Sequence, residues 1–63
     1  MYKNDIKEIR EMLLKIYKED EIDIWLLSKN KLLDNQIAVS LIFNGEANKV
    51  KQVVQQLLDG VYI

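Results

Sequence analysis

Few side chains in this sequence could carry out catalysis. Ser28 and Ser40 are the only hydroxyl groups besides the tyrosines, and the chain contains no histidine and no cysteine. Ser28 is followed by Lys29, but neighbours on a helix point about 100° apart, so this lysine could not activate the serine. A general base must lie within hydrogen-bond reach of the group it deprotonates. We therefore predict no catalytic residue and expect that the protein is not an enzyme.

Metal and cofactor sites are also poorly supported by the sequence. Asp20, Glu21 and Asp23 offer carboxylate oxygens, but the stretch KEDEID lacks the glycine and the alternating ligands of a calcium loop. The absence of cysteine and histidine excludes the usual zinc sites, and no glycine-rich loop is present to hold a phosphate. We interpret the carboxylates as a surface charge cluster and predict no metal and no cofactor.

The charge pattern argues against nucleic acid and membranes as partners. Nine basic and ten acidic residues give a net charge of -1, so no broad positive field attracts phosphate backbones or anionic lipids. Apolar runs are only a few residues long, and the first residues, MYKNDIKEIR, are charged where a signal peptide needs an apolar core. We predict a cytoplasmic protein, with no binding to nucleic acid by this chain alone.

The size and composition indicate a single small globular domain spanning residues 1–63. Apolar residues make up 49% of the chain and charged residues 30%, which is typical of a folded protein. A chain of this length buries only about 60% of the surface that its unfolded form exposes. Without cysteine it cannot gain stability from disulfides. Because association can bury what a small monomer exposes, we expect a homo-oligomer.

Helical periodicity begins near the N-terminus. Ile6, Ile9, Leu13 and Ile16 recur every three or four residues, which places them on one face of a helix predicted over 5–19.

A second helix is predicted over 21–29. The acidic residues 19–21 complement its N-terminus, because the exposed amides there favour negative charge. We interpret Trp25 as a core anchor, since one large aromatic side chain in so small a fold usually packs inside it.

The third segment, residues 36–44, is ambiguous. Its β-branched residues suit a buried strand, but Gly45 follows where a helix C-terminus expects glycine, so we favour a helix. Asp34 or Asn35 would provide its N-cap. We expect Phe43 to lie in the core, by the same reasoning as for the tryptophan.

The last segment has the strongest periodicity, and Gly60 supplies the permissive backbone angle that ends its helix. Its apolar stripe repeats at helical spacing and consists of Val50, Val53, Val54, Leu57, Leu58 and Val61. The fold class predicted from these four segments is all-α, a small bundle of about four short helices.

Residues 22–63 contain an ordered set of residues: Trp25, Leu26, Asn30, Leu33, Leu41, Ile42, Gly45, Glu46, Val50, Leu57 and Gly60. In this ordered set, residues 22–63 resemble the C-terminal toxin-binding domain of Xre/MbcA/ParS-type bacterial antitoxins. Two features depart from that pattern. Ile37 and Ala38 stand where members usually carry a Ser-Pro or Thr-Pro pair. Residues 1–21, predicted to form an N-terminal helix, are too short to contain the helix-turn-helix that normally precedes this domain.

The resemblance implies a protein-binding module that neutralises a toxin, commonly of the RES type, which consumes NAD. In that family the C-terminal part of the antitoxin lies at or near the active-site cleft of the toxin. Carried onto this sequence, the partner-binding residues are Gly60, Val61, Tyr62 and Ile63. The residues themselves leave an alternative open, in which Val61 closes the last apolar stripe while Tyr62 and Ile63 cover the chain's own core.

Two further functions fit the same sequence. One is a stand-alone or phage-encoded inhibitor of an unrelated host protein, and the other is a self-assembling structural module. A neighbouring toxin gene, a phage gene cluster, or the lack of any foreign partner would distinguish the three.

Overall fold

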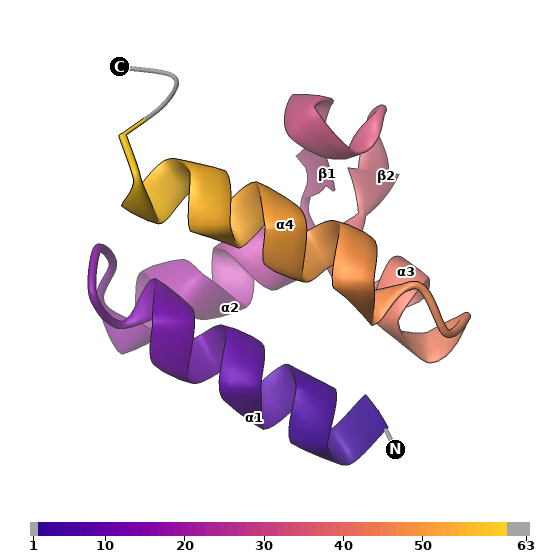
Figure 1. Ribbon diagram of the computed structural model, residues 1–63, viewed down its shortest axis with the longest axis horizontal. Coiled ribbons are helices and arrows are strands. Elements are labelled where there is room, and N and C mark those ends of the chain that lie inside the picture. The colour runs from indigo at the N-terminus through magenta and orange to yellow at the C-terminus, as the bar shows by residue number, and fades with distance from the viewer. Residues whose placement is uncertain (1, 61–63) are drawn as a thin grey trace.

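The computed structural model describes residues 2–60, with side chains from Asn4 onward. Within this range, Figure 1 shows α1 and α4 side by side and running in the same direction, with α2 behind them. The predicted small all-α bundle is confirmed. Its four α-helices are α1 (Tyr2–Leu13), α2 (Glu19–Leu27), α3 (Ala38–Phe43) and α4 (Ala47–Leu58).

The first helix is shorter than the predicted range 5–19. It ends at Leu13, whose carbonyl oxygen accepts the amides of Ile16 at 3.0 Å and Tyr17 at 2.8 Å in a tight turn. Ile16 therefore leaves the helical face and is 43% exposed. Helix α2 starts soon afterwards, where the Glu21 carboxylate accepts the Lys18 amide at 2.9 Å.

A small hairpin joins α2 to α3, and Figure 1 shows it at the edge of the bundle. Lys29 pairs with Ile37, and Asn30 with Gln36, in antiparallel register. Strand β1 covers Lys29–Asn30, 3-10 helix η1 covers Lys31–Leu33, and strand β2 covers Gln36–Ile37.

The hairpin corrects the predicted cap of the third helix. Asp34 and Asn35 have positive φ angles of 57° and 63°, so they reverse the chain before it enters β2 instead of capping α3. The residue before α3 is Ile37, whose side chain makes no capping bond. Of the two alternatives for residues 36–44, the helix accounts for Ala38–Phe43 and the strand for only two residues.

Both glycines end helices as predicted. At the end of α3, Glu46 donates its amide to Leu41 at 2.8 Å and Gly45 donates to Ile42 at 3.1 Å, which together form a Schellman motif. The φ angle of Gly45 is +83°, which a side chain would disfavour. Gly60, with φ 72°, ends α4 in a similar way, donating its amide to Leu57 at 3.2 Å.

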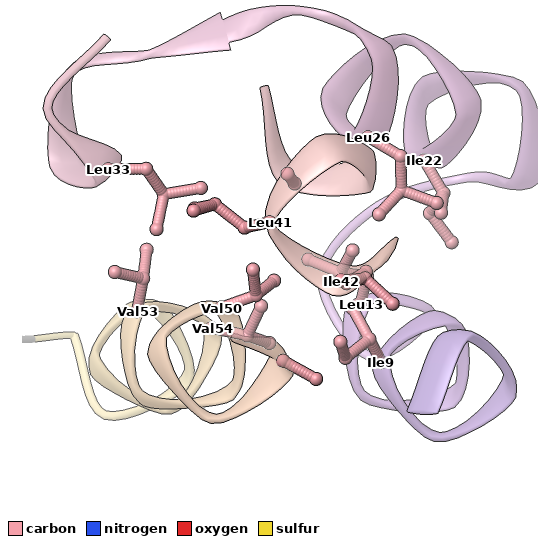
Figure 2. Packing of buried hydrophobic residues seen from close by; sticks show 12 residues of the cluster. Ile9, Leu13, Ile22, Leu26, Leu33, Leu41, Ile42, Val50, Val53 and Val54 are labelled. Atoms are coloured by element: carbon pink, nitrogen blue, oxygen red, sulfur yellow. The ribbon is translucent and has the colours of Figure 1, made fainter. Parts of the chain in front are cut away.

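The core forms where α3 sits among the other helices. Figure 2 shows Leu41 between Leu33 and the α4 valines, while Ile42 lies toward Ile9 and Leu13 of α1. The predicted stripe of α4 is confirmed for its described members, of which Leu58 is half-buried and the rest are buried. The buried cluster consists of Ile9, Leu13, Ile22, Leu26, Leu33, Ala38, Leu41, Ile42, Ala47, Val50, Val53 and Val54.

The expectation for Phe43 was wrong, because its side chain is 55% exposed. At 100° per residue, Leu41 and Ile42 take the core-facing positions of this short helix. Phe43, one and two positions later, is turned away from them. No helix in residues 2–60 is long and apolar enough to cross a membrane.

Ion pairs fasten α1 to its neighbours. Lys51 of α4 contacts Asp5 at 2.9 Å and Glu8 at 3.4 Å, and Arg10 of α1 contacts Asp23 of α2. The Lys51–Asp5 pair is partly buried, whereas the Arg10–Asp23 pair is exposed.

Candidate protein-binding surface

The predicted partner-binding segment begins at the end of α4. Gly60 is half-buried, and α4 holds it in place through a row of side chains packed in the core. Val61, Tyr62 and Ile63 lie outside the described residues, so the choice between partner contact and core packing for them stays a prediction. Gly60 is thus the one member of the predicted site that the structure locates.

Among the described residues, the large apolar side chains with the highest exposed fraction are two on α2. Ile24 and Leu27 are each 65% exposed. On the same helix, Ile22 is fully buried and Leu26 is 4% exposed. Helix α2 therefore buries one apolar face in the bundle and leaves a second apolar face uncovered.

A shallow groove runs beside this uncovered face, with a volume of about 390 Å³. Trp25 packs against the core, as predicted, yet it is only half-buried and also lines the groove. The tight turn after α1 places Tyr17 at the groove, where it too packs against the core. The lining consists of Tyr17, Glu21, Ile24, Trp25, Ser28, Lys29 and Asn30.

The two ends of α2 carry opposite charge. Glu19, Asp20 and Glu21 occupy its first turn, and all three are exposed. Lys29 and Lys31 follow just beyond its last residue and are also exposed. The groove joins the two ends, because Glu21 and Lys29 both line it.

Two lysines of α4 have raised pKa values. A hydrogen bond to Asp5 raises the pKa of Lys51 above its ordinary value of 10.5, and a hydrogen bond to Glu46 does the same for Lys49. Both stay protonated at neutral pH and so cannot act there as general bases.

The described residues offer little for chemistry. No group of three or more acidic, histidine or cysteine side chains among them could hold a metal ion. Within the same part of the chain, every buried side-chain nitrogen or oxygen has a hydrogen-bond partner. None of them therefore calls for a ligand as its partner. Apolar surface bordered by charge is suited to contact with another protein.

Sequence reasoning missed Ile24 and Leu27. The signal was present, because Ile22 and Leu26 share one face of a nine-residue helix. At 100° per residue, Ile24 and Leu27 then fall on the opposite side. Helix α2 therefore has apolar residues on both sides, and the bundle covers only one of them.

Comparison with known proteins finds a distant similarity to an antitoxin. The chain is 22% identical over 59 residues to the mycobacterial cidal antitoxin MbcA of Mycobacterium bovis, and to the MbcA proteins of two Mycobacterium tuberculosis strains. The match covers 94% of this chain and 52% of the relative, so the chain spans about half the length of the curated relatives it matches. No family model matches the chain. No solved structure matches it either.

Proposed function

We propose that this chain is a protein-binding module that neutralises a bacterial toxin. The observation that carries the proposal is the similarity to an antitoxin along 94% of the chain. The poor supply of reactive side chains favours binding over catalysis. The exposed apolar side chains on the described surface are a second support, because such surface commonly serves protein contact.

The proposed mechanism is steric occlusion of an active-site cleft by Gly60, Val61, Tyr62 and Ile63. Helix α4 is anchored in the core by its buried stripe, so it presents Gly60 from a rigid element. The proposed partner is a toxin of the RES type, in the cytoplasm, following the family that residues 22–63 resemble. A blocked cleft would keep NAD from the toxin without any reaction on this chain.

A binding titration tests this proposal. Purified full-length chain and a version ending at Gly60 would each be titrated into a purified RES-type toxin from the same genome, with heat of binding as the readout. We expect saturable binding by the full chain and a loss of at least about tenfold in affinity for the shortened chain, equivalent to about 1.4 kcal/mol.

Thermal unfolding of the two proteins provides the control. If the shortened chain melts markedly lower yet still captures the toxin, Val61 to Ile63 belong to the core and the occlusion mechanism is wrong. If the full chain binds no such toxin, the toxin-neutralising role itself is contradicted.

A further inference from the structure

The uncovered face of α2 has an order of charges that constrains what can cover it. The uncovered side of the helix has the acidic residues Asp20 and Glu21 in its first turn, followed by Ile24 and Leu27, and the exposed Lys29 follows just beyond its last residue. Glu21 lies in the first turn of α2, and Lys29 lies two residues after the last residue of the helix, so the two charges stand at opposite ends of α2. The surface is therefore a short apolar strip with a negative end and a positive end.

Such a strip is complementary to itself in one orientation. A second copy turned by a two-fold axis near Trp25 would lie antiparallel to the first, and its Lys29 would face Glu21. The same rotation brings that lysine close to Asp20, which lies four positions before Ile24 and therefore shares the uncovered face. A parallel arrangement would instead oppose the two acidic ends, which is repulsive.

A two-fold contact uses the same patch on both subunits, so each favourable pair occurs twice. Ile24 and Trp25 would lie near the axis, and the uncovered Ile24 would lose its contact with water. Apolar surface in the middle with charges at the rim is the usual arrangement of a protein interface.

We propose that the face of α2 formed by Ile24, Leu27 and the adjoining groove is the contact surface for a second copy of this chain, with the two helices antiparallel. This inference is independent of the proposed function, because the segment assigned to the toxin follows α4. A dimer built this way would carry two copies of that segment.

Sedimentation equilibrium of the full chain over a series of concentrations tests the proposal. Ile24→Lys puts a charge at the centre of the contact, and we expect its dimer dissociation constant to rise about tenfold or more. Leu32→Lys is the matched control, since Leu32 is also an exposed aliphatic residue, at 44%, but does not line the groove. It should leave dimerisation unchanged. Both side chains are exposed, so thermal unfolding should show that both variants fold.

Trp25 reports on the same surface, because it is the only tryptophan in the chain and lines the groove. Its emission should shift to shorter wavelength as the wild-type protein dimerises, and it should not shift with concentration in Ile24→Lys. A wild-type chain that stays monomeric overturns the proposal. So does a dimer that Ile24→Lys leaves intact. A monomeric chain whose toxin binding is lost in Ile24→Lys would assign this face to the toxin instead.

Reversed charges test the antiparallel orientation. Asp20→Lys and Lys29→Glu should each weaken the dimer about threefold, as expected for exposed ion pairs. The double variant should recover wild-type affinity, because it exchanges the two signs across the axis. A double variant weaker than both single variants would contradict this orientation.

Discussion

Helix α2 has two apolar faces, of which one is buried in the bundle and the other is exposed. Ile22 and Leu26 pack into the bundle beside α3, whereas Ile24 and Leu27 are each 65% exposed. Both pairs have the residue types of a core, and only the angle around the helix separates them. Composition therefore shows how much apolar surface the helix has, while the positions of the neighbouring helices decide which part is covered.

Helix α4 differs from α2 in this respect. Its apolar residues form one stripe and face the core, and its other side is polar. A helix with one stripe is satisfied by its own fold. Helix α2 has a second apolar face that its own fold leaves exposed, and the proposed dimer would cover it.

The largest expected effect comes from the buried face of α2. Ile22→Ala should lower the free energy of unfolding by about 2–5 kcal/mol, because it removes a fully buried side chain and leaves a cavity. For a domain of this size that is a large part of the total stability. Chemical denaturation measures it, and a loss below about 1 kcal/mol would contradict the described core.

The second largest effect is expected at Gly45, which ends α3. Helix α3 packs against the buried face of α2. Gly45→Ala should cost about 1–2 kcal/mol, since Gly45 has φ +83° and an L-residue is strained there. A new Cβ would meet no atom within 4 Å, so the cost arises from the backbone alone. Gly45→Asn should cost less, because asparagine tolerates this conformation. Equal losses in the two variants would show that the strain is not the cause.

A substitution on the exposed face of α2 should change the free energy of unfolding far less than one on the buried face. Ile24→Ala is the counterpart of Ile22→Ala, two positions away on the same helix. At dilute, monomeric concentrations we expect the free energy of unfolding to change by no more than about 0.5 kcal/mol. Alanine is the better helix former, and this offsets part of any loss in the free energy of unfolding. A loss comparable to that of Ile22→Ala would break the comparison, because it would mean that Ile24 is covered.

The smallest effect is expected from the ion pair between α1 and α4. The hydrogen bond to Asp5 raises the pKa of Lys51 above 10.5, so protonated Lys51 favours the folded state. This contribution is complete below pH 10.5 and is lost as the pH rises through the higher folded-state value. The melting temperature of the wild type should therefore fall toward that of Lys51→Met at strongly alkaline pH. Constant separation of the two melting curves up to pH 12 would contradict the assignment.

Much of the fold could be predicted because helical periodicity and glycine positions are local signals. Helices α1, α2 and α4 and the buried stripe of α4 follow from helical spacing, whereas α3 was predicted from the glycine that follows it. The early end of α1 at Leu13 and the exposure of Phe43 do not, because they depend on how neighbouring elements fit together. The turn at Asp34 and Asn35 was mistaken for a cap, since the same residue types serve both purposes.

The candidate binding surface divides in the same way. The structure places Gly60 at the end of α4. Its contact with a partner stays a prediction, as does that of residues 61–63. The uncovered face of α2 was not predicted, because the residue types Ile and Leu do not by themselves distinguish a buried side chain from an exposed one. Comparing the angles of Ile22 and Ile24 would have revealed it, since the two cannot face the same neighbour.

NAD consumption by a RES-type toxin, followed while the full chain is titrated in, tests the central proposal most directly. If this chain neutralises the toxin by occluding its cleft, NAD consumption should stop once each active site has met one chain, and a chain ending at Gly60 should leave it nearly unchanged. Undiminished NAD consumption at saturating full-length chain would contradict the proposal.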